Sequence, residues 1–394
     1  MFWLYQLLLS VSIPLFPLLK KTVSKRGKVS LKNRFSTEFS EGKQKFLLHV
    51  SSIGEVNSVK PLVKALQGKV SLTVFTDYGL ERARKIYPEI PSRISPIDLY
   101  PIVKNFLKKT SPKAVLIYET EIWPSLLKAS SELQVPTIFV SGKIGERTYR
   151  RIKRFEGFLK PLFSDKIFLS RSEEDAERAL KLGFKEVQVV GDLKLDYEPP
   201  EKGVSLEIDE ERPVVIWGST HEGEEELAVE VHKKLKRDFP NILTVIAPRH
   251  VGRRIDISGN VEYRSRTKRV RRETEFYIVD TVGELSSLYS YATVAVVGGS
   301  FVEGIGGHNP VEPVALKVPT LIGEFGNEFK EIAQTLKVPV LKRSELYPCL
   351  LTLLKEPKLR SKLGKESYFL WQERRGVTER ILRFLGERVE LQRN

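Results

Sequence analysis

The fold class can be read first from the segment Val297-Gly-Gly-Ser-Phe-Val-Glu-Gly-Ile-Gly-Gly-His-Asn-Pro-Val-Glu-Pro313. It follows an apolar, strand-like run at 293–297 and leads into a helix-like segment at 309–316. Its five glycines tolerate positive φ and let the backbone approach a ligand closely. Such a loop ahead of a helix presents N–H groups to an anion, typically a phosphate, and Glu312 can accept hydrogen bonds from sugar hydroxyls. Alternatively, the loop is a turn that only closes a βα unit, with Glu312 favoured by the helix dipole.

Strand-like apolar runs alternate with amphipathic segments along most of the chain. The first series of runs comprises 46–50, 72–75, 114–118, 137–140, 166–169 and 187–190, and the second comprises 214–217, 243–246, 276–279, 293–297 and 320–322. Short buried strands that alternate with helices indicate parallel sheets in an α/β fold. Between the series, prolines and charges replace the periodicity at 197–203. We therefore predict two doubly wound domains with a cleft between them.

Length and composition limit the classes of partner. A chain of 394 residues is long enough for two domains, and its single cysteine, Cys349, excludes an intramolecular disulfide. The net charge of +15 indicates anionic partners, among them nucleic acid, acidic lipid and phosphorylated sugar. The excess of Lys and Glu and the single Met lean towards a heat-adapted (thermophile) protein.

The N-terminal segment predicts membrane attachment. Residues 1–19 carry no charge, and this run is barely long enough to span a bilayer. Pro14 and Pro17 would kink a helix there. No basic region precedes this run, which argues against a cleaved signal peptide. Seven cations follow between Lys20 and Arg34 with no acid among them, which suits anionic lipids and places the body on the cytoplasmic face of the membrane. A buried N-terminal helix followed by a solvated basic linker is the alternative.

Two candidate sites follow strands of the first series, at the sheet edge where ligands bind in such folds. Glu55 lies in Ser51-Ser-Ile-Gly-Glu55, after strand 46–50, where it could act as a general base or merely cap a helix. Glu119 and Glu121 leave strand 114–118 together. They could orient an acceptor, raise the pKa of Glu55 by repulsion, or pair with a nearby Lys or Arg. We interpret Trp123 as a packing residue.

The second series supplies groups suited to an anion. Ser219 and Thr220 follow strand 214–217 with hydroxyls placed for a helix N-cap and an anion site. Pro248 and Arg249 follow strand 243–246, and the guanidinium fork could hold a phosphate or a carboxylate. No histidine spacing is typical of a metal site, so no metal is predicted. The basic clusters at 147–154 and 253–272 lack interleaved aromatic residues, so no nucleic-acid partner is predicted.

Taken together, the motifs closely resemble those of the Kdo (3-deoxy-D-manno-octulosonic acid) transferases of lipopolysaccharide biosynthesis, glycosyltransferase family 30. The resemblance is carried in order by an N-terminal apolar segment, Ser51–Glu55, Tyr118-Glu-Thr-Glu-Ile-Trp-Pro124, Glu173-Glu-Asp175, Gly191-Asp-Leu-Lys-Leu-Asp196, Ser219-Thr-His-Glu-Gly-Glu-Glu225, Ala247-Pro-Arg-His250, Gly298-Gly-Ser300, Gly306-Gly-His-Asn-Pro310 with Glu312, and Asn327-Glu-Phe329. These motifs extend over nearly the whole chain.

The resemblance implies a membrane-associated GT-B glycosyltransferase with two Rossmann-like domains that face each other. The C-terminal domain would hold the donor CMP-Kdo, and the N-terminal domain would hold the acceptor, a lipid A precursor (lipid IVA). Glu55 would take a proton from the acceptor hydroxyl, whose oxygen attacks the anomeric carbon while CMP leaves with inversion. No cofactor is implied, and a monophosphate leaving group can be stabilised by cations and dipoles without a divalent ion. The implied location is the cytoplasmic face of the inner membrane, where anionic lipids are further partners.

The same resemblance implies a role for each site residue. The donor-binding residues would be Ser219, Thr220, Pro248, Arg249, Gly298, Gly299, Gly306, Gly307, Asn309 and Glu312. The acceptor-side residues would be Glu119, Glu121 and Lys143, and Lys194 would meet donor charge between the domains. The expected divisions are an anchor at 1–20, an N-terminal domain at 21–192, a linker at 193–210, a C-terminal domain at 211–355, and C-terminal helices at 356–394 that could pack back on the N-terminal domain.

One motif departs from the family. Members commonly carry Asn-Ala-Arg-Leu-Ser after the fourth strand, whereas this chain reads Ser141-Gly-Lys-Ile-Gly145, so Lys143 keeps the charge but loses the bidentate fork. Acceptor contacts and the number of sugars added are therefore open. Two other functions remain: a UDP-sugar transferase or epimerase of the same fold, and a membrane-bound lipid-binding protein without enzymatic activity.

Overall fold

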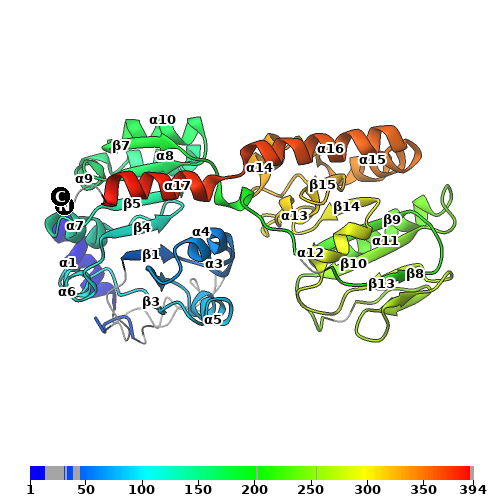
Figure 1. The fold of residues 1–394 in the computed structure, drawn as a ribbon, viewed down its shortest axis with the longest axis horizontal. Helices are drawn as coiled ribbons and strands as arrows, with labels where there is room; N and C mark the ends of the chain where they lie inside the picture. Colours follow the sequence, from blue (N-terminus) through cyan, green and yellow to red (C-terminus); the bar gives the residue numbers. More distant parts are fainter. Residues whose placement is uncertain (14–30, 32, 39–44, 201–202, 254, 391–394) are drawn as a thin grey trace. The chain divides into compact units, whose positions relative to one another are not determined.

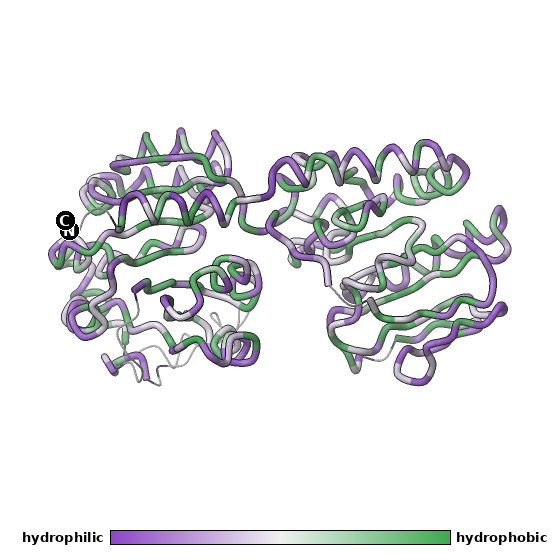
Figure 2. Tube along the Cα trace, in the orientation of Figure 1, coloured by the Kyte–Doolittle hydropathy of each residue, from purple (hydrophilic) through white to green (hydrophobic). Residues whose placement is uncertain are grey.

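The computed structural model describes residues 1–13, 31, 33–38, 45–200, 203–253 and 255–390. Two compact units divide the chain (Figure 1). Unit 1 comprises Met1–Asp196 and Gly376–Asn394, and unit 2 comprises Tyr197–Arg375. Hydrophobic residues run along the strands of both units, whereas the helices alternate between hydrophobic and hydrophilic residues (Figure 2). This distribution is expected of sheets that are covered on both faces.

Unit 1 is built on a parallel sheet of seven strands in the order β3-β2-β1-β4-β5-β6-β7. The strands are β1 (Phe46–Val50), β2 (Val70–Val74), β3 (Ser92–Ile94), β4 (Ala114–Tyr118), β5 (Thr137–Gly142), β6 (Ile167–Ser170) and β7 (Glu186–Val189). From β1 the chain first builds the sheet towards β3 and then continues on the other side with β4. The order therefore reverses between β1 and β4, the strands that precede Glu55 and Glu119.

Helices cover both faces of this sheet and enclose two hydrophobic cores. One core includes Val56 and Leu62 beside Val377 and Ile381 from the end of the chain. The other includes Phe106, Leu127 and Phe163. The helices of unit 1 are α1 (Phe2–Ser12), α3 (Ile53–Ser58), α4 (Lys60–Ala65), α5 (Asp77–Ile86), α6 (Tyr100–Thr110), α7 (Pro124–Glu132), α8 (Glu146–Lys153), α9 (Glu156–Phe163), α10 (Glu173–Leu182) and α17 (Val377–Leu385), with a 3₁₀ turn at Leu193–Leu195.

Unit 2 repeats this plan with a parallel sheet in the order β11-β13-β10-β9-β14-β15-β16. The strands are β9 (Val214–Thr220), β10 (Leu243–Pro248), β11 (Val261–Tyr263), β13 (Phe276–Ile278), β14 (Val294–Val297), β15 (Thr320–Gly323) and β16 (Val340–Leu341), and β8 (Glu207–Ile208) pairs with β12 (Arg269–Val270) in a small separate sheet. The order reverses between β9 and β14, so the glycine-rich loop after β14 lies at the switch point of this sheet.

The helices of unit 2 again cover both faces, around two further cores. They are α11 (Glu224–Leu235), α12 (Leu285–Leu288), α13 (Val311–Val314), α14 (Lys330–Thr335), α15 (Arg343–Lys355) and α16 (Pro357–Arg374). All eleven predicted strands are present, whereas β3, β8, β11, β12 and β16 were not predicted. These five strands have only two or three residues, which is too short to show an apolar run or an alternation.

The segment expected as a linker and the segment expected as C-terminal helices are each divided between the two units. Within the range 193–210, Leu193 and Leu195 are buried in unit 1, whereas Leu206 is buried in unit 2. Within the range 356–394, α16 belongs to unit 2 and α17 to unit 1. The carboxylate of Asp196 accepts hydrogen bonds from the backbone N–H groups of Gly376 (2.8 Å), Val377 (3.1 Å) and Thr378 (2.5 Å). These bonds join the point where the chain leaves unit 1 to the point where it returns.

The N-terminal helix α1 packs on unit 1 through one face. Gln6 is buried, donates to Ser125 Oγ at 2.7 Å and accepts from the backbone N–H of Tyr100 at 2.7 Å, while Tyr5 donates to Asp98 at 2.8 Å. The opposite face exposes Trp3, Leu4, Leu7, Leu8 and Val11. None of the helices in the described ranges is long and apolar enough to cross a membrane.

The remainder of the predicted anchor, residues 14–20, lies outside the described residues, as do Lys20, Lys21, Lys25, Arg26, Lys28 and Lys32. Arg34 corrects the prediction of seven lipid-facing cations, because it is buried and its guanidinium donates to the carbonyl and hydroxyl oxygens of Ser95 at 3.3 and 3.2 Å. It also lies over the ring of Phe75. The Arg34 guanidinium is therefore bound inside the protein and does not face lipid.

Candidate active site

Glu55 is held at the carboxyl end of β1 by the turn that starts α3. Ser52 caps this helix, and the Glu55 carboxylate accepts hydrogen bonds from the backbone N–H of Ser51 at 2.6 Å and from the Ser51 hydroxyl. Burial, followed by repulsion from Glu119, raises the pKa of Glu55 to about 8, although the bonds from Ser51 oppose this. Among the residues that the structure describes, Glu55 forms no ion pair. Glu55 therefore binds the turn that starts α3 and also has a raised pKa, and its side chain remains partly exposed.

Glu119 lies at the end of the neighbouring strand β4 and is paired with Lys194. Its backbone has a φ of +54°, a left-handed conformation that is uncommon outside glycine. The Lys194 ammonium donates to the Glu119 carboxylate at 2.8 Å. Burial acts to raise the pKa of Glu119, but attraction to Lys194 and then to Lys143 outweighs it, so this pKa is lowered. Glu119 is thus an anion that helps to keep the neighbouring Glu55 protonated.

Lys194, which is expected to meet donor charge between the domains, lies in unit 1. The 3₁₀ turn at Leu193–Leu195 belongs to unit 1, and the Leu193 N–H donates to Ser141 Oγ at 2.9 Å. This bond draws the turn back onto the end of β5, which neighbours β4. The ammonium therefore reaches Glu119 in the same unit.

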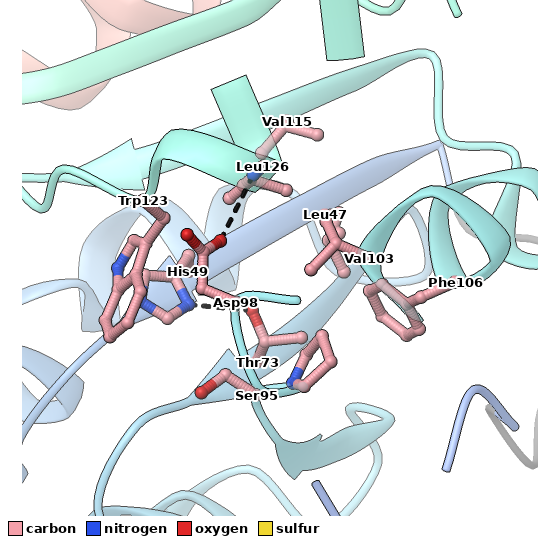
Figure 3. A pocket seen from close by; sticks show the side chains of 11 residues that line it. Leu47, His49, Thr73, Ser95, Asp98, Val103, Phe106, Val115, Trp123 and Leu126 are labelled. Carbon is pink, nitrogen blue, oxygen red and sulfur yellow. Dashed lines mark hydrogen bonds between the residues drawn. The ribbon is translucent and has the colours of Figure 1, made fainter. Parts of the chain in front are cut away.

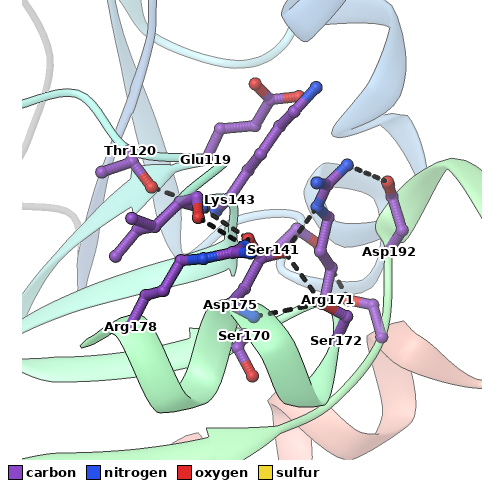
Figure 4. A network of polar contacts seen from close by, with 12 residues as sticks. Glu119, Thr120, Ser141, Lys143, Ser170, Arg171, Ser172, Asp175, Arg178 and Asp192 are labelled. Atoms are coloured by element: carbon purple, nitrogen blue, oxygen red, sulfur yellow. Dashed lines mark hydrogen bonds and ion pairs between the residues drawn. The ribbon is translucent and has the colours of Figure 1, made fainter. Parts of the chain in front are cut away.

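A polar network fixes the turn that carries Lys143 (Figure 4). The Lys143 N–H donates to Thr120 Oγ1 at 3.0 Å, and the Ile144 N–H donates to Asp175 Oδ1 at 2.7 Å. Arg171 donates to the other oxygen of Asp175 at 2.8 Å. Lys143, expected on the acceptor side, lies beside Glu119 in this network (Figure 4). The turns after β4 and β5 therefore hold Glu119 and Lys143 in a fixed relation.

A small apolar pocket lies elsewhere in unit 1, between the sheet and helices α6 and α7 (Figure 3). Its polar end includes His49, whose Nδ1 lies 3.0 Å from Thr73 Oγ1. Burial, followed by repulsion from Arg34, lowers the pKa of His49 to about 3, so this ring is neutral. Trp123 packs against the rings of His49 and Phe75, as its interpretation as a packing residue requires. None of Glu55, Glu119 and Glu121 lines this pocket.

The first part of the glycine-rich loop in unit 2 does not leave its N–H groups free. The Gly298 N–H donates to the Gly218 carbonyl at 2.8 Å, and the Gly299 N–H donates to the carboxylate of Glu224 at 2.7 Å. A Cβ on Gly298 would lie 2.8 Å from the Ser219 carbonyl and from Glu224. The expectation that these two N–H groups face a phosphate is therefore wrong. At these positions glycine is required for close packing of the two loops.

The second part of the loop lies near Arg249. Glu312 accepts a hydrogen bond from Ser286 at 2.6 Å, and burial raises its pKa while Ser286 and Arg249 act to lower it. The Asn309 side chain accepts from the Val311 N–H at 3.0 Å and so fixes the start of α13. A Cβ on Gly306 would meet Glu328, and one on Gly307 would meet Gly326. The loop is thereby packed against the segment after β15.

Two histidines join the same region. The Nε2 atoms of His221 and His308 lie 2.8 Å apart, and their rings are stacked. Burial is the first cause that lowers the pKa of His308 to about 3, and Arg249 is the second. Burial also lowers the pKa of His221, to about 4, with His250 and Arg249 acting in the same direction. Arg249, which follows β10, therefore acts electrostatically on a histidine after β9 and on a histidine in the loop after β14.

The structure thus brings the predicted residues into two groups, one in each unit. Ser219, with a φ of +57°, and Thr220 end β9, and Thr220 donates to Glu225 at 2.7 Å. Pro248 ends β10 at a shift in strand register. The sequence assigns no role to Glu224, Ser286 or His308, which the contacts above place among these loops. Glu224 and His308 stand inside motifs of the sequence, but only the folded chain shows what they touch.

Comparison with known proteins finds several similar transferases. The family model described as 3-deoxy-D-manno-octulosonic-acid transferase (kdotransferase) matches residues 29–197. The 3-deoxy-D-manno-octulosonic acid transferase of Haemophilus influenzae is 28% identical over 377 residues, which cover 88% of each chain. The transferase of the same name from Aquifex aeolicus is 29% identical over 296 residues, covering 74% of this chain and 79% of that one. Together these matches support the recognition of the chain as a Kdo transferase.

A solved structure supports the fold of this Kdo transferase. The UDP-GlcNAc 2-epimerase of Neisseria meningitidis, bound to UDP-GlcNAc, superposes with a TM-score of 0.58 over 87% of this chain and 100% of that one. At 13% identity this likeness shows the fold alone. With its two parallel, doubly wound sheets, the Kdo transferase is a glycosyltransferase of GT-B-like fold. Within the described ranges, no three or more His, Cys, Asp or Glu side chains are grouped so that they could hold a metal ion.

Proposed function

We propose that this Kdo transferase moves Kdo from CMP-Kdo to a lipid A precursor, lipid IVA, with Glu55 as the general base. The Glu55 carboxylate takes the proton of an acceptor hydroxyl, and the hydroxyl oxygen forms a bond to the anomeric carbon of Kdo. The bond from that carbon to the phosphate oxygen breaks, and CMP leaves with the electron pair. A single displacement of this kind inverts the anomeric configuration.

The observation that carries this proposal is the state of Glu55. Its carboxyl group is partly exposed at the sheet's switch point, and its pKa of about 8 results from burial and from the neighbouring Glu119. A base whose pKa lies near the working pH combines a useful basic fraction with a strong proton affinity. The fixed anion Glu119 and the cation Lys143 beside it offer the acceptor a hydrogen-bond acceptor and a partner for a phosphate.

For the leaving group, the supporting feature is Arg249 with the second part of the glycine-rich loop. Arg249 is exposed at the end of β10, and its charge is felt by His308 and Glu312. We propose that the guanidinium binds the departing phosphate, that residues 306–309 approach it closely, and that Glu312 binds the ribose. A fixed cation can stabilise this charge, so we expect transfer without a divalent ion.

Membrane association is proposed from α1. Its exposed apolar face and its buried polar contacts through Gln6 suit a helix that lies on a bilayer surface while docked to unit 1. The cations between 20 and 32 would add attraction to anionic lipids. We place the protein at the cytoplasmic face of the inner membrane.

The decisive experiment combines a transfer assay with a binding titration. The purified protein is incubated with a CMP-Kdo source and lipid IVA, and the product is weighed by mass spectrometry. We expect Glu55→Gln to lose transfer by about 10²- to 10⁴-fold because the base is removed, while CMP binding stays normal. Glu81→Gln, the same change at an exposed position of α5, serves as the matched control. Full transfer by Glu55→Gln would contradict the proposal.

The same titration separates the competing functions. A UDP-sugar transferase or epimerase would bind UDP more tightly than CMP, which would contradict the proposed donor. A lipid-binding protein without enzymatic activity would form no product of increased mass and would be unaffected by Glu55→Gln.

A further inference from the structure

In unit 2 the carboxylate of Glu224 is completely buried at the start of α11. One of its oxygens accepts the N–H groups of Gly299 at 2.7 Å and His221 at 2.9 Å. The other accepts the N–H groups of Ser300 at 3.1 Å and Phe301 at 2.9 Å. No Lys, Arg or His side chain within the described part of the chain forms an ion pair with it.

A buried charge of this kind is tolerated only when hydrogen bonds replace its hydration. A carboxylate offers about four lone-pair sites, and four N–H donors occupy them here. Hydrogen bonds to an ionised acceptor are stronger than neutral ones, and the N-terminus of α11 adds a favourable dipole. The contacts are therefore a strong constraint on the backbone that supplies the four donors.

These donors come from two separate loops. His221 belongs to the turn after β9, and Gly299, Ser300 and Phe301 belong to the loop after β14. A Cβ on Gly298 would lie 2.8 Å from the Glu224 carboxylate, which shows how closely the second loop is drawn in. From the other side, the His221 and His308 rings join the same two loops.

We propose that Glu224 is a positioning residue of the donor site, an inference that rests on the proposed function. It does not touch the donor. It binds the first part of the glycine-rich loop to the turn after β9, so that the second part of that loop and His308 stand at a fixed distance from Arg249 before the donor arrives. Ordering these loops in advance removes an entropic cost from nucleotide binding.

The test is the variant Glu224→Gln. Its amide oxygen can accept two of the four N–H groups, but its NH2 group would face the other two donors, so one pair of contacts is lost. We expect the Kd for CMP and the KM for the donor to rise at least tenfold, while the KM for the acceptor changes less than twofold. Glu226→Gln is the matched control, because Glu226 lies in the same helix turn, is exposed and, among the described residues, accepts a hydrogen bond only from the Gly223 N–H, at 2.9 Å.

A measurement on the unaltered protein keeps the inference testable if Glu224→Gln fails to fold. In hydrogen exchange without nucleotide, the amides of Gly299, Ser300 and Phe301 should exchange at least a hundredfold more slowly than an unbonded loop amide. Fast exchange there, an unchanged CMP affinity in folded Glu224→Gln, or an equal rise of donor and acceptor KM would overturn the inference. Titration with UDP as well as CMP tests the proposed donor separately from the role of Glu224. Absence of Kdo transfer in the unaltered protein would contradict the proposed function, whereas the exchange rates test the role of Glu224 alone.

Discussion

At the scale of single residues, the chemistry that we propose for unit 1 rests on the unequal states of two neighbouring carboxyl groups. Glu119 is paired with Lys194 and stays ionised, whereas no cation among the described residues forms an ion pair with Glu55, whose pKa is raised to about 8. Groups whose environments separate their pKa values commonly divide the roles in catalysis. Here the ionised residue would orient the acceptor while the other exchanges the proton.

A pH dependence follows from these states. Because only deprotonated Glu55 can accept a proton, kcat/KM should rise with pH and level off above about 8. Glu119→Gln removes the second cause of the raised pKa and leaves Lys194 as an attractive cation, so the rising limb should move to lower pH. Glu121 is a smaller cause, and Glu121→Gln should shift it less. Rate profiles of the three proteins between pH 5 and 10 provide the measurement, and a shift to higher pH in Glu119→Gln would contradict the assignment.

At the scale of elements, α1 combines a buried polar contact with an exposed apolar face. Gln6 holds the helix to the starts of α6 and α7, and on the opposite face Leu4, Leu7, Leu8 and Val11 are exposed. A helix that spans a membrane is apolar on all sides, whereas one that lies on a surface has this two-sided character. We therefore favour surface binding.

Charging the exposed face should detach the protein from lipid. We expect Leu4→Glu combined with Leu8→Glu to lower recovery with anionic vesicles at least tenfold, because two apolar side chains are replaced by anions. Transfer to a soluble acceptor should be unchanged. Leu359→Glu with Phe369→Glu, which charges two exposed residues of α16, is the matched control. Undiminished vesicle recovery of the α1 variant would show that other residues bind the lipid.

At the scale of the whole molecule, unit 1 is completed by α17, which follows all of unit 2 along the chain. Val377, Ile381 and Phe384 of α17 are buried in the core that also contains β1 and β2, and Asp196 binds the first N–H groups of that helix. A unit assembled from two distant segments depends on the contact that joins them.

Asp196→Ala should therefore destabilise unit 1 and leave unit 2 unaffected. Three buried or partly buried N–H groups lose their acceptor, and we expect a loss of about 1–3 kcal/mol. Calorimetry should show a lower Tm for one of two transitions. Asp209→Ala is the control, because it removes an ion pair with the mainly exposed Arg269 and should lower the stability much less than Asp196→Ala. Equal effects of the two changes would contradict the joining role of Asp196.

The sequence by itself determined the class of fold, the two series of strands and the ends of strands where the functional residues stand. Those features follow from local apolar runs such as 46–50 and 114–118, which form strands over the predicted residues. The motifs that carry the resemblance to the Kdo transferases are likewise local, because each is a short run of consecutive residues.

Only the tertiary structure decided what these residues touch. It paired Lys194 with Glu119, buried Arg34, returned α17 to unit 1, and turned the N–H groups of Gly299 to Phe301 onto Glu224. Each of these contacts joins segments that are far apart along the chain. The physical reason is that apolar periodicity reports how a segment is buried, whereas the partner of a charge or of a backbone N–H depends on which distant segment packs beside it.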